Sequence, residues 1–301
     1  MRRRALILAA FFVTAVAFSQ GIQPMGRPSG HVPPPPRDGE GADIAVVPIL
    51  IYHSIRPYIP TDTSAVRRYI ATPETLEKEL AYLSNNGFTS ITFDDLARRL
   101  TKGTTLPAKP VIISFDDDWQ SQFTYAVPLL KKYGFTATFY IWVAVVGLKH
   151  HMTWDEVKAL DAQGMQIGCH TMTHPFLTRV KSDDVLRKEI VGAKQKIEAH
   201  IGTPVTSIAY PFGQYNERVV AMVREAGFTS ARSTWPGVVH SGEGIFSLTG
   251  LIRTESKTSL VETMTRYITE ASAGADAAAA SALGLPPGNE SVSRAPAPAT
   301  P

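Results

Sequence analysis

The sequence predicts an α/β protein in which helices cover the outside of a mostly parallel sheet. Short apolar runs rich in Val, Ile and Phe alternate with amphipathic stretches along most of the chain. This alternation is typical of βα units, in which each helix carries the chain back to the start of the next parallel strand. Several apolar runs also end in Asp or His, and the carboxyl ends of parallel strands are where such folds place their chemistry.

The first βα unit follows a proline-rich stretch near the start of the chain. Residues 46–52 form an apolar run that ends at His53, as expected for a buried strand. Thr72 stands before Pro73, a combination typical of a helix start, and leucines follow at helical spacing. Gly87 is expected to end this helix.

The same reasoning predicts the remaining elements in order. Further strands are expected at 110–115, 136–142, 165–170, 206–210 and 228–232. Helices are expected at 96–100, 125–133, 153–163, 183–201, 217–226 and 259–271. Thr153 and Glu156 have the spacing of a capping box, and Asp94 and Asp95 are expected to cap the helix that follows them.

Both ends of the chain are expected to lie outside the folded domain at 46–272. Residues 1–19 join three arginines, a short apolar run and a small-residue cleavage site, which is the pattern of a secretory signal. We therefore expect a periplasmic or secreted protein, or a membrane-anchored one if the signal stays uncleaved. Residues 20–45 are rich in Pro and Gly and predict a linker, and 273–301 predict a disordered tail.

Composition and charge narrow the possible partners. Hydrophobic residues make up 44% of the chain, which is ample for a core. The net charge is +3, and removal of the three arginines of the signal would leave zero, so we expect no nucleic-acid partner. Cys169 is the only cysteine, which excludes an internal disulfide. Association with the cell envelope stays open, and the sequence does not determine the oligomeric state.

Two expected strand ends carry residues that can bind a metal ion. His170 and His174 are four residues apart, so one turn of backbone can aim both imidazoles at one point. Asp117 follows the strand at 110–115 and would complete a three-ligand site with an open position for water, as in catalytic zinc sites. An isolated H-x-x-x-H pair is also common on protein surfaces, so the second strand end carries much of this argument.

The order and spacing of these segments resemble the polysaccharide deacetylase family, carbohydrate esterase family 4 with its NodB homology domain. Phe115-Asp116-Asp117 matches the family's aspartate pair, His170 to His174 match its H-[ST]-x-x-H motif, and Tyr210 to Gly213 match part of a third motif. The resemblance spans roughly residues 46–253. It implies an incomplete, distorted (β/α) barrel and a metal-dependent hydrolase that removes acetyl groups from a polysaccharide.

The resemblance also implies roles for individual residues. Asp117, His170 and His174 would hold a divalent metal, with Zn²⁺ the expected ion, and Asp116 would act as general base. The backbone N–H of Phe212 would stabilise the oxyanion, with Tyr210 beside it at the substrate. From its place in a loop before Pro236-Gly237, Trp235 is expected to line the substrate groove.

His53 is the expected general acid. Many family members take this histidine from a late Leu-x-His motif, but the corresponding segment 247–253 contains no histidine. A subgroup that resembles the biofilm poly-N-acetylglucosamine deacetylases, with circularly rearranged motifs, takes it from an early Tyr-His strand end. Tyr52-His53 matches that arrangement. A lone histidine after an apolar strand is also commonly structural.

Two residues depart from the family pattern. Asp118 stands where glycine is usual, and Ala209 stands where an arginine is usual. Asp116 then needs another cation to orient it, and Arg253 is the first candidate, with Arg232 the second. The other histidines match no motif: His150 and His151 are assigned to a loop, and His200 and His240 to the solvent-facing surface.

Together these features predict an exported N-deacetylase of β-linked N-acetylglucosamine polymers, with poly-N-acetylglucosamine the favoured substrate. Peptidoglycan or chitin-type polymers are the alternative substrates. Because Asp118 and Ala209 depart from the family pattern, a catalytically inactive carbohydrate-binding protein on the same fold is a second alternative. A non-catalytic metal carrier is a third.

Overall fold

A curled parallel sheet forms the centre of the fold. The computed structural model describes residues 44–254, 260–265 and 269, and within them the strand order is β10-β9-β8-β7-β6-β2-β12. All these neighbours are parallel, and β5 pairs with the first residues of β6. The strands are β2 (Ile49–Tyr52), β5 (Thr89–Ser90), β6 (Pro110–Phe115), β7 (Thr138–Ile141), β8 (Gln166–Cys169), β9 (Ser207–Ala209), β10 (Ser230–Arg232) and β12 (Leu251–Ile252).

The barrel is incomplete because β10 and β12, the outer strands of this order, do not pair with each other in the described residues. The segment that leads into β12 runs along β10 instead. The N–H of Ala231 donates to the carbonyl of Ile245 (2.9 Å), and that of Ser233 donates to Leu248 (2.8 Å). A curled sheet with this gap confirms the predicted incomplete, distorted (β/α) barrel.

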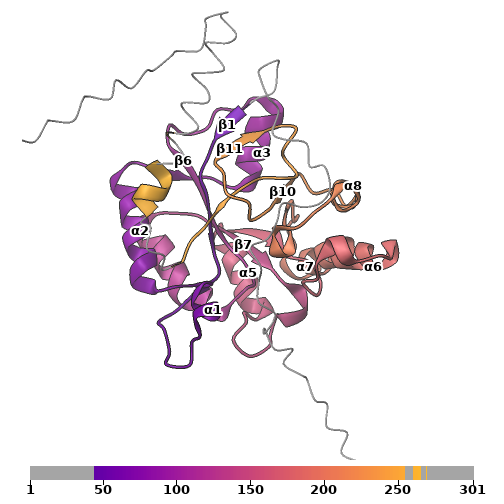
Figure 1. Ribbon diagram of the computed structural model, residues 1–301, viewed down its shortest axis with the longest axis horizontal. Helices are drawn as coiled ribbons and strands as arrows, with labels where there is room; N and C mark the ends of the chain where they lie inside the picture. The colour runs from indigo at the N-terminus through magenta and orange to yellow at the C-terminus, as the bar shows by residue number, and fades with distance from the viewer. Residues whose placement is uncertain (1–43, 255–259, 266–268, 270–301) are drawn as a thin grey trace, which may run out of the picture.

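Helices cover the outer surface of the sheet (Figure 1). They are α1 (Ser64–Arg67), α2 (Pro73–Asn85), α3 (Phe93–Lys102), α4 (Val127–Tyr133), α5 (Trp154–Ala162), α6 (Asp183–Arg187), α7 (Ala193–Ile201) and α8 (Glu217–Glu225). Thr153 and Glu156 form the predicted capping box of α5. The capping role predicted for the Asp94–Asp95 pair is confirmed for Asp95, which completes a capping box with Thr92 at the start of α3.

Two π-helical turns interrupt the expected helices. The helical stretch predicted at 183–201 is present, but η4 (Lys188–Gly192) separates α6 from α7. The second, η1 (Gln122–Ala126), precedes α4. Such turns occur frequently at functional sites. Of the last expected helix, residues 260–265 are helical, and most of the rest lies outside the described residues.

Short strand pairs account for elements that the sequence did not predict. β1 (Ile44–Val46) pairs antiparallel with β11 (Val239–Ser241), and β3 (Ser54–Ile55) pairs with β4 (Ile70–Ala71). Strands of two or three residues are too short to show a period, so only their partners define them. β1 begins at Ile44, two residues before the expected domain start at 46.

Side chains alternate between the barrel interior and the layer of helices outside it. Ile49 and Ile51 of β2 pack with Ile112 in one cluster, whereas Leu50 and Tyr52 belong to the larger cluster under the helices. The apolar face of α3 packs into the interior cluster and closes the amino-terminal end of the barrel. At the other end, the interior side chains become polar; they include Asp116, His170 and Arg232.

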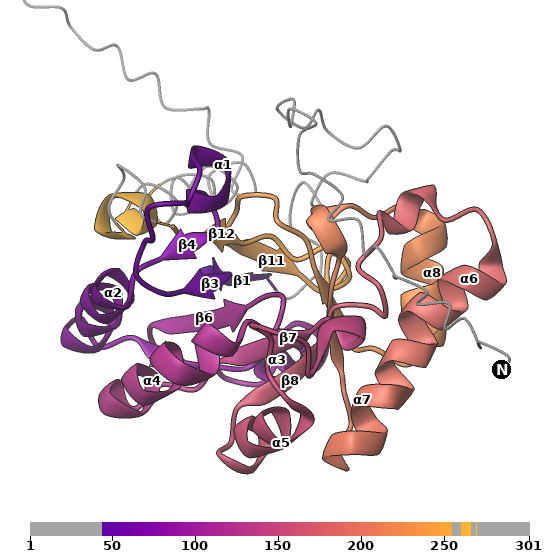
Figure 2. The same cartoon turned by 90° about the horizontal axis from the view of Figure 1, so that it is seen from below.

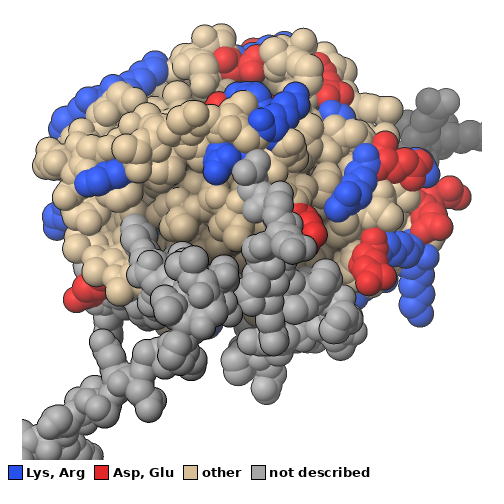
Figure 3. Space-filling view, turned by 90° about the horizontal axis from the view of Figure 1, so that it is seen from above, with Lys and Arg blue, Asp and Glu red and all other residues tan. Residues whose placement is uncertain are grey.

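The structure does not describe most of the residues on which the expectations about the chain ends depend. The predicted signal at 1–19, most of the linker and the tail at 273–301 lie outside the described residues. Among the helices described, none combines the length and apolar character needed to cross a membrane. The face seen from the side of β1 and α3 carries both positively and negatively charged side chains (Figure 3).

Candidate active site

The candidate site lies at the carboxyl ends of β2, β6, β8 and β10. Figure 2 views the molecule from the side of α1, which follows the carboxyl end of β2. His53 follows β2, Asp116 and Asp117 follow β6, and His170 follows β8. Parallel strands aligned in register bring these ends to one edge of the barrel, as the strand-end pattern in the sequence predicted.

Three side chains bring donor atoms together at this edge. The Nε2 atoms of His170 and His174 are 3.1 Å apart, and each lies 3.5 Å from Oδ1 of Asp117. Ligand atoms at about 2.0–2.2 Å from a tetrahedral zinc ion are separated by about 3.4 Å. The three atoms are therefore spaced like ligands of a single ion, and they form a possible metal-binding triad.

Hydrogen bonding and burial prepare these atoms to bind a cation. Nδ1 of His170 lies 2.8 Å from the carbonyl of Ala209, so Nδ1 carries the proton in the neutral ring and Nε2 keeps its lone pair. Burial, with the nearby charge of His170, lowers the pKa of His174 to about 4. Oδ1 of Asp117 is buried and has no hydrogen-bond partner among the described residues. The donor set fits a divalent cation such as Zn²⁺.

The carboxylate of Asp117 also favours a cation, because it stays ionised. Burial raises the pKa of Asp117, but the nearby imidazoles of His170, His53 and His174 together hold that pKa below its usual range. Burial lowers the pKa of His170, but Asp117 and Asp116 raise it above its usual value.

The loop that carries His174 is held in a strained shape. Thr171 and His174 have positive φ angles of 68° and 59°, which non-glycine residues adopt at a cost and often at functional sites. The N–H of His174 donates to Oγ1 of Thr171 (3.0 Å). The N–H and hydroxyl of Thr173 donate to the carboxylate of Glu189 (2.8 and 2.6 Å), which lies on the π turn η4. No sequence pattern pointed to Glu189.

Asp116 lies beside the triad with only 2% of its side chain exposed. Its Oδ1 forms an ion pair with Arg232, and its Oδ2 is 3.9 Å from Nε2 of His53. Burial raises the pKa of Asp116, but the charge of Arg232, followed by those of His170 and His53, holds it below the usual range. Asp116 is therefore ionised, with one oxygen held by Arg232.

The expectation that Arg253 orients Asp116 is wrong, and the second candidate, Arg232, occupies that place. Arg253 follows β12 at the side of the sheet that faces α2, where it pairs with the buried carboxylate of Glu79 and donates to Thr263 Oγ1 (3.4 Å). Of these two arginines, Arg232 is the one that points into the barrel. Arg232 lies on β10 opposite Ala209 of β9, so the next strand supplies the guanidinium that is usual at position 209.

The neighbours of Arg232 fit a buried guanidinium. Its carbon Cζ lies 4.9 Å from the ring centroid of Tyr140, whose hydroxyl is 2.7 Å from Oγ of Ser207. This ring occupies space that a side chain on Gly168 would fill, because a Cβ there would collide with it. A glycine before the metal-ligand strand end thus makes room for the ring against which Arg232 packs.

His53 is fixed next to Asp116 by a residue that the sequence analysis missed. Nε2 of Gln122 donates to the carbonyls of both His53 (2.8 Å) and Asp116 (2.6 Å). Gln122 is fully buried and lies on the π turn η1. The ring of Tyr69 meets the His53 ring edge-on at 5.2 Å. Gln122 belongs to no motif, and only the folded chain brings its amide to the two strand ends.

The backbone conformation of Asp118 is one that suits the glycine usual at this position in the family. Its φ is 41°, in the left-handed region that glycine adopts freely and that Asp tolerates better than most residues. Its Oδ1 accepts a hydrogen bond from the backbone N–H of Trp142 (2.9 Å), and its Oδ2 is 3.7 Å from Nδ1 of His151. Burial raises the pKa of Asp118 to about 6, although His151 and the Trp142 N–H act in the opposite direction.

The third motif is divided between the site and the core. Phe212 lies beside the triad with a φ of 59°, its ring edge-on to His174 at 4.8 Å and stacked on Phe176 at 3.9 Å. The predicted substrate contact of the Tyr210 side chain is wrong. That side chain is 1% exposed, and its hydroxyl donates to the carbonyl of Phe246 (3.0 Å) in the layer under the helices.

Two expectations about other residues have different outcomes. Trp235 is half-buried after β10 and packs against the core, and its role in a substrate groove stays a prediction. The expectation that His240 faces solvent is wrong, because its ring is 4% exposed and Nε2 lies 2.9 Å from the carbonyl of Val47. His240 is on β11, whose pairing with β1 no sequence pattern predicted.

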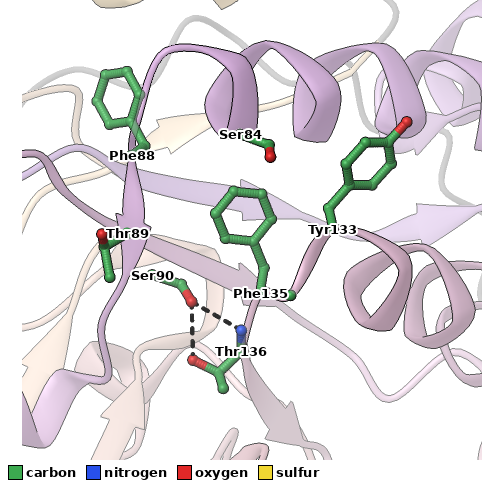
Figure 4. A pocket seen from close by; sticks show the side chains of 8 residues that line it. Ser84, Phe88, Thr89, Ser90, Tyr133, Phe135 and Thr136 are labelled. Atoms are coloured by element: carbon green, nitrogen blue, oxygen red, sulfur yellow. Dashed lines mark hydrogen bonds between the residues drawn. The ribbon is translucent and has the colours of Figure 1, made fainter.

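A separate pocket of about 330 Å³ lies at the opposite end of the barrel. Its walls come from the turns that lead into β5 and β7, and Oγ of Ser90 accepts the N–H of Thr136 (2.8 Å) (Figure 4). The lining residues are Ser84, Phe88, Thr89, Ser90, Tyr133, Gly134, Phe135 and Thr136. They include no carboxylate, histidine or cysteine, so this pocket lacks the groups that the candidate site provides.

Fold and site together define a class of protein: an α/β half-barrel whose strand ends combine a possible metal-binding triad with a buried carboxylate and a neighbouring histidine. Comparisons with known proteins make the class specific. Residues 103–231 match the family model for polysaccharide deacetylases. That range includes Asp116, Asp117, His170, His174 and Phe212 and ends one residue before Arg232.

Two relatives are similar to this chain in sequence, and a solved structure has a similar fold. YxkH of Bacillus subtilis (strain 168), a candidate polysaccharide deacetylase, is 29% identical over 204 residues, which cover 68% of this chain and 70% of that protein. The poly-beta-1,6-N-acetyl-D-glucosamine N-deacetylase of Staphylococcus aureus (strain MRSA252) is 22% identical over 199 residues, which cover 59% of this chain and 68% of that protein. The structure of the Streptococcus pyogenes deacetylase PplD in complex with acetate has a TM-score of 0.67 and 24% identity, covering 73% of this chain and 97% of that chain.

The chain thus carries a polysaccharide deacetylase domain at residues 103–231, and its homologues in that family are hydrolases that act on the C–N bonds of acetamido groups.

Proposed function

We propose that this chain is a metal-dependent N-deacetylase that releases acetate from β-linked N-acetylglucosamine polymers, with poly-N-acetylglucosamine its favoured substrate. One observation carries the proposal. Asp117, His170 and His174 converge on one point, directly beside the buried Asp116 and the partly buried His53. This is the set of groups that amide hydrolysis needs.

An acetamide resists hydrolysis because its carbonyl is a weak electrophile and its nitrogen is a poor leaving group. Asp117, His170 and His174 would hold a divalent cation, with Zn²⁺ the expected ion, which would polarise the carbonyl as a Lewis acid and would lower the pKa of water from about 15.7 to about 7. Asp116 accepts the proton of the attacking water on Oδ2, because Arg232 occupies its other oxygen. Arg232 also keeps Asp116 in the ionised form that a base requires.

The departing nitrogen needs a proton, and His53 is placed to donate it. Its Nε2 is 3.9 Å from Oδ2 of Asp116, so the acid and the base face the same reacting group. The backbone N–H of Phe212 donates to the oxygen of the acyl group as negative charge develops there. The left-handed backbone of Phe212 beside His174 supports this assignment, because such strain is retained where the surrounding structure requires it.

The place of His53 in the chain supports the preference for poly-N-acetylglucosamine. It follows the early strand β2 rather than a late motif, which is the arrangement of the subgroup that resembles the biofilm deacetylases. The Staphylococcus aureus relative carries the name of that activity. Such a polymer lies outside the cytoplasm, so this function agrees with export through the signal predicted at 1–19 and with possible association with the cell envelope.

Two departures from the family pattern, Asp118 and Ala209, favoured an inactive carbohydrate-binding protein, but the fold accommodates the first and compensates for the second. Asp118 adopts the backbone conformation that glycine would adopt, and Arg232 supplies the cation that Ala209 lacks. Catalysis is therefore better supported than binding alone or metal carriage. Peptidoglycan or chitin-type deacetylation stays the alternative within enzymes.

Acetate release tests the proposal directly. The wild-type protein and Asp116→Asn are incubated with poly-N-acetylglucosamine, purified peptidoglycan and chitin oligomers, with and without a chelator. Asp94→Asn is the matched control, because Asp94 lies on α3 at the opposite end of the barrel, where it accepts a hydrogen bond from Thr206 (2.6 Å). We expect the wild type and the control to release acetate fastest from poly-N-acetylglucosamine, and the chelator or Asp116→Asn to abolish release.

The other outcomes separate the alternatives. Faster release from peptidoglycan or chitin would replace the favoured substrate and retain the enzyme class. Glycan binding without acetate release under any divalent metal would identify the inactive carbohydrate-binding protein. Tight metal binding with neither glycan affinity nor release would identify the metal carrier.

A further inference from the structure

We propose that Asp118 and His151 form a brace on the backbone of Asp117 and thereby set the affinity of the triad for its cation. Both are positioning residues, since neither is a member of the triad. The inference rests on the proposed metal dependence, but it is independent of the polysaccharide that the enzyme uses.

Asp117 needs such a brace because its backbone is strained. Asp117 and Asp118 have φ angles of 72° and 41°, so two consecutive non-glycine residues are left-handed. Each such residue costs conformational free energy and persists only where its surroundings hold it. Oδ1 of Asp117 has no hydrogen-bond partner among the described residues, so that oxygen is directed at the triad by the backbone rather than by a hydrogen bond of its own.

His151 and Asp118 hold this backbone from two directions. Nδ1 of His151 lies 3.1 Å from the carbonyl oxygen of Asp117, so it acts as the donor to that oxygen. The same Nδ1 is 3.7 Å from Oδ2 of Asp118. The other carboxylate oxygen of Asp118, Oδ1, accepts a hydrogen bond from the backbone N–H of Trp142, directly after β7 (2.9 Å). The left-handed turn is thus tied both to the neighbouring strand and to the loop that carries His151.

The position of His151 is itself well defined. Its ring stacks on Trp119 with centroids 4.7 Å apart, and the backbones of these two residues form an antiparallel bridge. The N–H of Met152 donates to the carbonyl of Asp118 (2.9 Å), and the N–H of Gln120 donates to that of His150 (2.8 Å). His151 is therefore attached to the Asp117 turn through both its ring and its backbone.

The brace also reaches a second ligand of the triad. The ring of Trp142 lies 4.9 Å from that of His174 and meets the His151 ring edge-on at 6.1 Å. Displacement of His151 would therefore disturb the packing behind His174 as well as the turn at Asp117. Groups that orient metal ligands in this way typically change metal affinity about 10- to 100-fold when they are removed.

Asp118→Gly tests the loss of the carboxylate contacts without adding backbone strain. Glycine adopts the φ of 41° freely, so this change removes the carboxylate and leaves the turn accessible. We measure the Zn²⁺ dissociation constant of each purified protein by competition with a chromophoric chelator. We expect Asp118→Gly to weaken binding about 10- to 100-fold and Asp118→Asn, which keeps an acceptor for the Trp142 N–H, to weaken it less.

Variants of His151 test the second half of the brace. His151→Phe keeps an aromatic ring to stack on Trp119 but removes the donor to Asp117, so we expect the same weakening as with Asp118→Gly. His151→Asn places an amide N–H near the position of Nδ1, and we expect it to recover part of the affinity. The matched control is His200→Phe, because His200 also stacks on a tryptophan, Trp154 (3.8 Å), and bonds a backbone carbonyl through Nδ1.

The outcomes distinguish this inference from the proposed function. Wild-type affinity in both Asp118→Gly and His151→Phe would overturn the brace while leaving the metal site intact. Equal weakening in His200→Phe would also overturn it, because the effect would then be general. A wild-type protein that binds no divalent metal would overturn both the brace and the proposed metal dependence.

Discussion

Arg232 and Asp116 form an ion pair inside the barrel, although 116 residues separate them in the chain. The two side chains are 0% and 2% exposed, so water does not screen their attraction. The pair joins β10 to the strand end that carries the proposed base. It therefore links the stability of the barrel to the ionisation of Asp116.

Arg232→Met is expected to destabilise the protein and to shift its pH profile. Loss of one partner leaves a buried charge uncompensated, which costs about 3–5 kcal/mol in the free energy of unfolding. Burial raises the pKa of Asp116 and Arg232 is the foremost group that lowers it, so the variant's Asp116 has a higher pKa. Because the base acts when ionised, the acidic limb of kcat/KM moves to higher pH. Urea unfolding and a pH–rate profile measure the two effects.

Arg253→Met is the matched control for that prediction. Arg253 is also a buried arginine in an ion pair, with Glu79, but it lies on the far side of the sheet from Asp116. We expect comparable destabilisation and an unchanged acidic limb. A shift of the limb in Arg253→Met, or its absence in Arg232→Met, would contradict the assignment of Arg232.

His53→Ala is expected to lower kcat about 10²- to 10⁴-fold, as is typical when a general acid is removed. Its Nε2 faces Asp116 rather than the triad, so the bound metal should be unaffected. Steady-state kinetics and metal analysis of the purified variant check both statements. Loss of metal would instead identify His53 as a ligand, and unchanged kcat would assign the proton to another donor.

Gln122→Leu is expected to lower kcat because it releases the two strand ends that carry His53 and Asp116. Two carbonyls lose their donor inside the protein, which costs about 1–3 kcal/mol for each buried unsatisfied group. Gln166→Leu is the control, since Gln166 accepts bonds from Phe93 and Thr138 at the opposite end of the barrel. We expect Gln166→Leu to lose stability with little change in kcat. Equal kcat in both variants would show that Gln122 is only structural.

His240 is expected to make the stability fall as the pH falls. Burial lowers its pKa to about 4 in the folded protein, against 6.5 when unfolded. Its contribution is complete above pH 6.5 and is lost as the pH falls toward 4, so at pH 5 about 2 kcal/mol has gone. Urea unfolding at pH 7 and pH 5, with chelator present, compares wild type with His240→Gln. The variant should lose about 2 kcal/mol less over that range, and an equal loss would show that His240 does not titrate there.

Much of the fold could be predicted because it depends on local patterns. Neighbouring residues determine the strand and helix periods, the helix start at Thr72-Pro73 and the Thr153–Glu156 capping box. The structure has these elements close to the expected positions. The short pairs of β1 with β11 and β3 with β4 carry no such pattern. They form because the rest of the fold brings the segments together.

The candidate site divides in the same way. The identity of Asp116, Asp117, His170 and His174 follows from motifs, because each motif lies within one strand end. The contributions of Arg232, Gln122 and His151 do not, because each joins strand ends or loops that are distant in the chain. For the same reason, the sequence could not decide between Arg253 and Arg232 or exclude the Tyr210 side chain from the site.

Spacing over a few positions was enough to predict the main helices and strands, the family motifs and the residues able to bind a cation. Contacts between distant segments were needed to find which arginine reaches Asp116, which side chains face the barrel interior and which loops support the strained turn at Asp117. A curled sheet sets these distances through the register of strands far apart in the chain, and no local pattern encodes that register.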